Sequence, residues 1–122
     1  MRIAILGAGP AGLTGAYYLA LLGHAVTVYD SRPEAGGMLR YALPEYRLPK
    51  RVLDREIALI ERLGVRFQFN VRVGEDLTLN DIAHQYDAVF LAIGTWKEAW
   101  VYLPGTELTG VIPALPFLEG VA

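Results

Sequence analysis

The chain has 122 residues, a net charge of −2 and no cysteine, and 53% of its residues are hydrophobic. This length favours one domain with a real core, and the scattered charges offer no basic surface for nucleic acid. Without cysteine the chain forms no disulfide and ligates no iron–sulfur cluster, and its two histidines lie too far apart in sequence to favour a zinc site. A mean hydropathy of +0.31 is typical of parallel α/β domains, whose central strands are buried on both faces.

The first thirty residues predict a strand, a helix and a second strand. Residues 2–6 (RIAIL) form a short apolar run bounded by glycine, as buried parallel strands do. Residues 10–22 predict a helix that ends at Gly23, and residues 25–29 (AVTVY) predict a strand that Asp30 closes. The apolar residues at helical spacing on one face of this helix are Leu13, Ala16, Tyr17, Ala20 and Leu21.

The same alternation continues to residue 93. Residues 49–63 predict a second helix, and residues 65–69 alternate apolar and polar side chains, as in a strand covered on one face. A capping box opens a short helix over residues 78–85, and residues 87–93 (DAVFLAI) predict another buried strand. Residues 101–122 are rich in proline and glycine and are expected to be mostly irregular. The whole order is the βαβ rhythm of a doubly wound parallel sheet with three layers.

The motif GAGPAG at residues 7–12 joins the first strand to the first helix. In a dinucleotide fingerprint Gly7 permits the tight turn, Gly9 lets a pyrophosphate approach the backbone, and Gly12 lets the helix pack close to the strand. The helix N-terminus then offers free N–H groups to the phosphates. Asp30 lies 21 residues after Gly9, where an acid binds the adenosine ribose and repels the 2′-phosphate of NADP. The sequence therefore predicts a bound dinucleotide, either FAD or NAD.

Residues 34–50 (EAGGMLRYALPEYRLPK) form a long loop of a kind that usually serves a ligand or a partner. With this block, with GAGPAGLTGAYYLALLGHAVTVYD before it and with LAIGTWK and GVIPALPFL after it, the chain resembles the FAD-binding half of the glutamate synthase small-subunit family. That family belongs to the flavoproteins with two dinucleotide-binding domains. The resemblance covers essentially the whole chain and implies a Rossmann-like sheet with strand order 3-2-1-4.

The resemblance also implies a set of cofactor contacts. Gly36 and Gly37 would lie along the FAD pyrophosphate and ribityl chain, Arg47 would contact the cofactor, and Val73 would lie against the adenine. Residues 93–95 would form a second backbone approach. The expected cofactor-binding residues are Gly7, Gly9, Pro10, Ala11, Gly12, Asp30, Ser31, Gly36, Gly37, Met38, Leu39, Arg47, Val73, Ile93, Gly94 and Thr95.

Some of these residues have an alternative role. Met38, Leu39 and Val73 are equally typical of a hydrophobic core. The neighbouring charges Arg40 and Lys50 are expected to be surface charges or partner contacts rather than ligands of FAD. The family usually carries Glu where this chain has Asp, so the expected ribose contact is one methylene shorter.

The resemblance implies an FAD-binding subunit or fragment of a glutamate-synthase-like oxidoreductase, which passes electrons from NAD(P)H through FAD to a partner. Family members continue beyond the position of Ala122 into an NAD(P)H domain, so residues 1–122 form the FAD-binding domain and residues 101–122 lead toward that absent domain. The chain carries no convincing catalytic acid, base, nucleophile or metal ligand set. The donor NAD(P)H would therefore need another domain or chain.

Two alternatives remain open, namely a plain NAD-binding module and a non-catalytic assembly protein that kept the fold. Unpaired sheet edges and apolar patches favour a dimer or a larger complex. The composition favours a cytoplasmic location, with no membrane segment.

Overall fold

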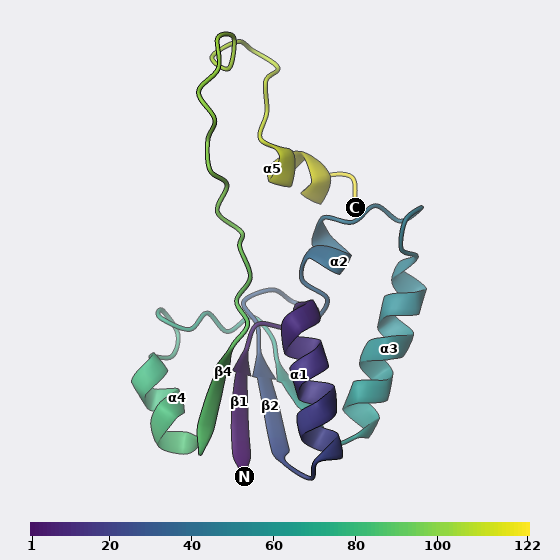
Figure 1. Ribbon diagram of the computed structural model, residues 1–122, viewed down its shortest axis with the longest axis vertical. Helices are drawn as coiled ribbons and strands as arrows, with labels where there is room; N and C mark the ends of the chain where they lie inside the picture. The colour runs from purple at the N-terminus through teal and green to yellow at the C-terminus, as the bar shows by residue number, and fades with distance from the viewer.

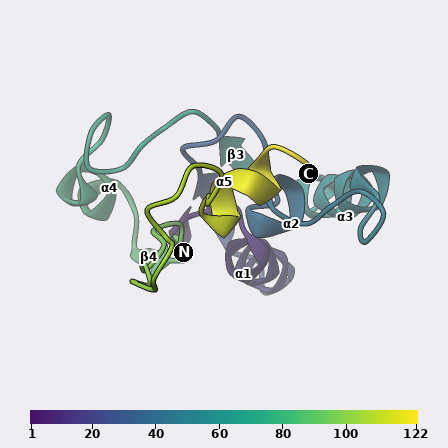
Figure 2. The same ribbon diagram turned by 90° about the horizontal axis from the view of Figure 1, so that it is seen from above.

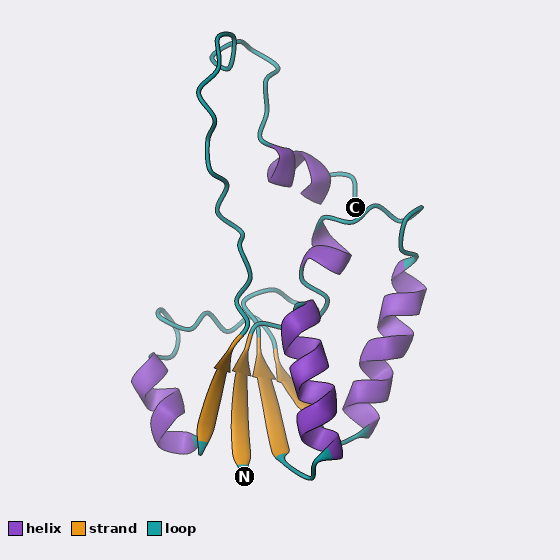
Figure 3. Cartoon of the chain, in the orientation of Figure 1, coloured by secondary structure: helices purple, strands orange, loops and turns teal.

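The computed structural model describes all residues, 1–122, and its centre is a four-stranded parallel sheet (Figures 1 and 3). The strands are β1 (Arg2–Leu6), β2 (Ala25–Tyr29), β3 (Arg66–Gln68) and β4 (Ala88–Leu91), in the order β3-β2-β1-β4. This confirms the strand order 3-2-1-4. All three strand pairs are parallel, and Ile3 of β1 lies opposite Val26 of β2 on one side and Ala88 of β4 on the other.

Helices cover both faces of the sheet, which confirms the three-layer α/β fold (Figure 2). Because side chains alternate along β1, Ile3 and Ile5 join a core under α1 and α3, whereas Ala4 and Leu6 pack against Ile82 of α4 on the opposite face. None of the helices combines the length and the hydropathy needed to cross a bilayer. The helices are α1 (Pro10–Leu21), α2 (Met38–Tyr41), α3 (Lys50–Arg62), α4 (Leu79–Gln85) and α5 (Ala114–Glu119).

The expected burial of two elements is wrong. On α1 the side chains of Tyr17 and Leu21 are 38% and 54% exposed, because the helix contacts the sheet through small residues. A Cβ on Gly15 would lie 2.8 Å from the ring of Phe90 on β4. Strand β4 itself is mostly exposed, with Leu91 at 59%, because β4 is an edge strand that has only β1 beside it.

The structure contains two helices that the sequence pattern did not predict. Helix α2 is one turn inside the loop of residues 34–50, and α5 interrupts the otherwise irregular residues 101–122. In Figure 1 the chain after β4 runs away from the sheet as a long arm and returns, so that α5 lies above α2. Glu98, near the start of this arm, accepts a hydrogen bond from the backbone N–H of Leu115 in α5.

Two cations hold the loop of residues 34–50 together, which corrects their expected role as surface or partner charges. The Arg40 side chain is only 11% exposed, donates to the carbonyl of Ala35 (2.6 Å) and pairs with Asp54 of α3. The Lys50 ammonium donates to the carbonyls of Leu39 (3.1 Å) and Leu43. These charges satisfy loop carbonyls that no secondary structure pairs, so they are structural.

Helix α1 can pack on the end of β1 only because residue 12 is glycine, and we expect Gly12→Ala to disrupt this contact. A Cβ at Gly12 would lie 1.8 Å from the carbonyl oxygen of Gly7. Because this oxygen belongs to the backbone, it cannot move aside by a change of rotamer. The free energy of unfolding in urea should fall by about 3 kcal/mol or more. The matched control is Gly120→Ala, directly after α5, where the nearest atom would be 3.5 Å away. Equal stabilities of the two variants would contradict this packing.

Tyr29 predicts a loss of stability at high pH. Burial, together with the 2.9 Å hydrogen bond between its hydroxyl and that of Tyr86, raises the pKa of Tyr29 from 10.0 to about 12. Because the folded-state pKa is the higher one, the neutral phenol stabilises the fold fully below pH 10, and this contribution disappears between about pH 10 and 12. Urea unfolding across this range should reveal the decline, and Tyr29→Phe should flatten it. An unchanged pH slope in Tyr29→Phe would be inconsistent with a shifted pKa.

Candidate functional site

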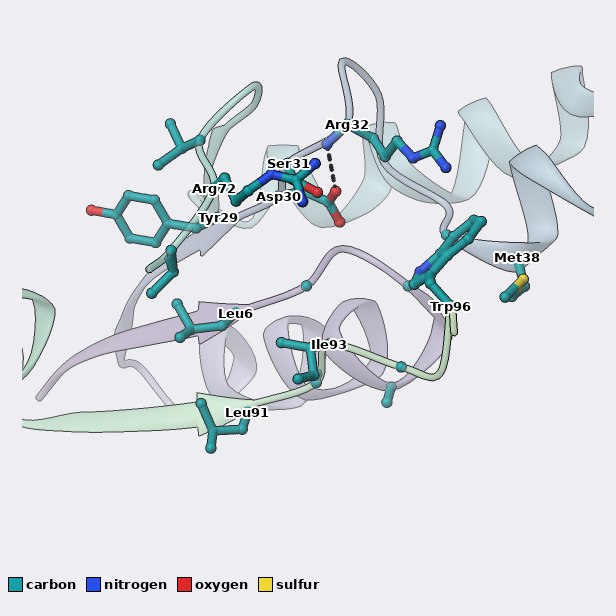
Figure 4. Close-up of a pocket in the computed structure, with 18 of the residues that line it drawn as sticks. Leu6, Tyr29, Asp30, Ser31, Arg32, Met38, Arg72, Leu91, Ile93 and Trp96 are labelled. Carbon is teal, nitrogen blue, oxygen red and sulfur yellow. Dashed lines mark hydrogen bonds between the residues drawn. The ribbon is translucent and has the colours of Figure 1, made fainter. Parts of the chain in front are cut away.

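A cavity of about 670 Å³ lies at the carboxyl ends of the strands, between the loops that follow β1, β2 and β4 (Figure 4). Ligands of open α/β sheets bind at this edge, where the strand order reverses. Here β1 lies between β2 and β4, so the chain leaves β1 toward β2 and β3 on one side and reaches β4, on the other side, only by its third crossover. The cavity therefore occupies the topological switch point of the sheet.

Most of the residues expected to bind a cofactor line this one cavity. They come from the glycine loop after β1, the acid after β2, the start of α2, the segment after β3 and the end of β4. These residues are Gly7, Gly9, Pro10, Ala11, Asp30, Ser31, Gly37, Met38, Val73, Ile93 and Gly94.

The other five expected residues do not line the cavity. Gly12 packs against Gly7, as described above, and a Cβ on Gly36 would meet the Leu53 side chain at 2.7 Å. Leu39 packs on the hydrophobic core, in agreement with its alternative role. Arg47 is exposed, with its guanidinium 5.9 Å from the Tyr46 ring. Thr95 is exposed beside Gly94, and its contact with a cofactor, like that of Arg47, stays a prediction.

The loop after β1 is closed toward the protein and open toward the cavity. Gly7 has φ +110°, and a Cβ there would lie 2.2 Å from the carbonyl oxygen of Ala92, so only glycine fits. Gly9 is different, because its Cβ would meet nothing closer than 3.9 Å. The space in front of Gly9 is therefore free for a ligand, and the missing side chain lets that ligand approach the backbone.

Helix α1 begins at this open space without a side-chain cap. Its N-cap is Gly9, Pro10 stands in the first turn, and no acidic residue lies there. The first N–H groups and the positive end of the helix dipole consequently face the cavity with no protein anion to satisfy them. Such a terminus favours an anionic ligand, and phosphate is the group that commonly occupies it.

The Gly-Gly loop of residues 36–37 packs directly on this terminus. The N–H of Gly36 donates to the carbonyl of Ala8 (2.8 Å), and a Cβ on Gly37 would lie 2.7 Å from the Cα of Gly9. The two backbones therefore touch where neither has a side chain. Gly37 has φ +53° and leads into Met38 at the cavity wall.

The Asp30 carboxylate connects the ends of two strands. One oxygen accepts from the N–H of Ala8 (2.7 Å) in the glycine loop, and the other accepts from the N–H of Arg32 (2.8 Å). Both bonds are charge-assisted, so they fix the glycine loop relative to β2. Each carboxylate oxygen has a second lone pair, and the expected bond to a ribose hydroxyl stays a prediction.

The sequence prediction missed a cluster around Arg32, a residue that lines the cavity. Its guanidinium carbon lies 4.9 Å from the ring centre of Tyr41 and 4.8 Å from that of Trp96, and the guanidinium pairs with Glu119 of α5. Burial raises the pKa of Tyr41 above its usual value. The position of Arg32, two residues after Asp30 at the end of β2, could have indicated that it lies in the site. Its partners come from distant segments, so the sequence pattern could not predict them.

The remaining cavity residues also lie where strands end, which is the signal that could have found them. They are Leu6, Tyr29, Val71, Arg72, Leu91, Ala92 and Trp96. Together with the expected residues they supply one carboxylate, two guanidinium groups, two hydroxyls and several backbone N–H groups. This set can hold phosphates and a ribose against apolar walls, and it fits a dinucleotide.

Comparison with known proteins supports this interpretation. The NAD(P)-binding Rossmann-like domain family matches residues 5–69. The putative oxidoreductase AegA of Escherichia coli is 44% identical over 117 residues, which span 96% of this chain and 18% of AegA. The glutamate synthase [NADPH] small chain of Halomonas elongata is 43% identical over 117 residues, which span 96% of this chain and 25% of that protein. The chain thus spans a quarter or less of the length of these relatives.

A solved structure of Mycobacterium tuberculosis FprA in complex with NADPH has the same fold. It superposes with a TM-score of 0.83 at 26% sequence identity, over 97% of this chain and 28% of FprA. The family match covers more than half of the 122 residues. The chain belongs to the NAD(P)-binding Rossmann-like domain family, and its relatives include the glutamate synthase small chain and other oxidoreductases.

Proposed function

We propose that this chain binds the ADP half of FAD, as the FAD-binding part of an NAD(P)H-dependent oxidoreductase of the glutamate synthase small-chain type. The observation that carries the proposal is the contact between the two glycine loops. Gly37 packs on Gly9, and together they leave an uncapped helix terminus open to a cavity of about 670 Å³. A pyrophosphate needs such a cradle of backbone N–H groups and missing side chains.

The cavity lining runs from Asp30 and Val73, past Gly9, to Met38 and Trp96. The ADP half is common to FAD and NAD, so the preference for FAD rests on the second glycine loop, residues 36–37, which in the family that the chain resembles lies along the FAD pyrophosphate and ribityl chain. The alternative of a plain NAD-binding module keeps support from the family description, which names NAD(P) as the ligand.

The residues present fit the ADP half of FAD in a specific way. Asp30 would accept from ribose hydroxyls, Val73 would contact the adenine, and the N–H groups at the start of α1 would hold the pyrophosphate. Bound flavin would supply the electron transfer chemistry, whereas these residues bind it, orient it and exclude water from the phosphates.

We place the donor site and the electron acceptor outside residues 1–122, in another domain or chain. The two relatives described above are about four to five times as long as this chain. A second groove lies between α1 and α3, and 10 of the 13 residues that line it are hydrophobic. Residues 101–112 form an exposed arm with Tyr102 86% exposed, and an apolar surface of this kind favours a partner. Residues 101–122 would then connect the FAD-binding domain to that partner domain.

The proposal is tested by titrating the colourless chain with FAD and, separately, with NAD. We expect saturable FAD binding, followed by flavin fluorescence and absorbance, and weaker NAD binding. Gly9→Ala should lower the FAD affinity about tenfold or more, because the added methyl group occupies the phosphate approach without touching the protein.

Gly120→Ala is the matched control and should leave FAD affinity unchanged. A circular dichroism spectrum of Gly9→Ala like that of the unmodified chain would show that the fold is retained. Binding of NAD in place of FAD would establish the NAD-binding module. Binding of neither dinucleotide would favour the non-catalytic assembly protein.

Asp30→Asn should weaken both the fold and the binding of FAD. The amide group has one acceptor oxygen instead of two, so either the N–H of Ala8 or that of Arg32 loses its partner. The free energy of unfolding should fall by about 1–3 kcal/mol, and FAD affinity should fall with it. Asp87→Asn is the control, because it affects one comparable hydrogen bond, from the backbone N–H of Arg2 at the start of β1, and Asp87 does not line the cavity. If Asp30→Asn lowers stability but leaves FAD affinity unchanged, the ribose contact is wrong.

A further inference from the structure

Arg32 is the cation of the cavity whose present partner comes from farthest away in the sequence. It lines the cavity together with Gly9, Gly37 and Trp96. Figure 4 shows its side chain directed away from Asp30, toward the end of the cavity where Trp96 and Met38 lie. This is the end at which the two glycine loops meet.

The two aromatic rings fix the position of this guanidinium. Tyr41 and Trp96 each lie within 5 Å of its central carbon, a distance at which a ring face attracts a cation. The rings themselves lie 6.3 Å apart at 65°. At this inclination the rings cannot both lie parallel to the guanidinium plane, and a cation–π contact uses the charge of the group rather than its N–H donors. The N–H edge is the part that recognises carboxylate and phosphate.

Glu119 occupies that edge. It lies in α5, at the end of the arm, and reaches back over the cavity to pair with Arg32. Both side chains are about a third exposed, at 37% and 35%. An ion pair this accessible is weak, so a stronger anion can replace the carboxylate.

The other candidate cations fit this place less well. Arg72 also lines the cavity, but it is 62% exposed and its guanidinium lies 3.5 Å from Glu75 in the same loop. Arg47, the cation expected from the resemblance, does not line the cavity. Arg32 thus combines a fixed orientation with a place in the wall beside the glycine loops.

We propose that Arg32 is the phosphate-binding cation of the dinucleotide site, and that the Glu119 carboxylate occupies it until a dinucleotide phosphate displaces it. The proposal rests on the proposed function, since it requires a dinucleotide at this cavity. Its consequence is that binding of a dinucleotide in the cavity is coupled to the attachment of α5. When phosphate takes the guanidinium, α5 loses its ion pair to the nucleotide-binding domain and keeps the Glu98–Leu115 hydrogen bond.

The test measures binding of FAD and of 5′-ADP to Arg32→Ala, Glu119→Gln and the double variant. Arg32→Ala should lower both affinities about tenfold, because a charge-assisted bond to phosphate is lost. Glu119→Gln should raise them about three- to fivefold, since the competing carboxylate is gone. In the double variant the gain should vanish, because Glu119 acts only through Arg32.

Glu107→Gln is the matched control for charge. It removes one negative charge from the same arm, but Glu107 contacts only the backbone N–H of Gly105. Its affinities for FAD and 5′-ADP should equal those of the unmodified chain. A gain in Glu107→Gln as large as that in Glu119→Gln would overturn the proposal, because it would reflect overall charge.

Amide hydrogen exchange of α5 in the unmodified chain gives a second test, which does not depend on the affinities of the variants. The amides of residues 117–121 should exchange faster when 5′-ADP is bound, because the Glu119 tether is released. Slower or unchanged exchange with 5′-ADP bound would overturn the proposal, as would a loss of affinity in Arg47→Ala with none in Arg32→Ala. If the unmodified chain binds neither FAD nor 5′-ADP, the proposed function itself fails.

Discussion

The structure depends on backbone contacts that only residues without side chains can make. At Gly7, Gly12 and Gly37 an added Cβ would lie 1.8–2.7 Å from backbone atoms of Ala92, just after β4, or of the glycine loop itself. These contacts bring α1 onto the sheet, and they bring the loop of residues 34–50 onto the start of α1. At Gly9 the same absence leaves empty space instead of a contact. Two of the positions that hold the layers together, Gly7 and Gly37, therefore also line the cavity.

The regular elements were predictable from the sequence because each has a local signal. Strand β1 follows from an uninterrupted apolar run, and α3 from Leu53, Ile57 and Ile60 at helical spacing. Helix α4 has the expected capping box, since Thr78 and Asp81 bond each other's backbone N–H. The strand order followed from family resemblance. In the candidate site, glycine spacing and the end of β2 predicted the GAGPAG loop and Asp30, whereas Gly37, Met38, Val73, Ile93 and Gly94 were implied by the family resemblance.

The remaining features depend on partners distant in sequence, for which periodicity contains no information. The exposure of β4 follows from its place at the sheet edge, although its sequence reads like a buried strand. The roles of Arg40 and Arg32 depend on Asp54 and Glu119, which become neighbours only after folding. Arg47 was expected in the site because of its position in a motif, whereas the turn after Pro44 directs it to an exposed loop. Motif spacing thus located the backbone of the site better than its charged side chains.

The charges around the cavity indicate why the site must change when an anion binds. Asp30 is satisfied by two N–H groups, Arg32 by Glu119, and Arg72 lies beside Glu75. Both cations of the cavity therefore lie beside carboxylates, and Asp30 is held by backbone N–H groups. A pyrophosphate adds two negative charges, and the α1 terminus supplies only about half of a positive charge. In the proposal above, the balance comes from a cation that exchanges its partner. Arg32 meets this requirement, since its exposed partner belongs to an arm that leaves the domain, whereas the bonds of Asp30 hold the glycine loop in place.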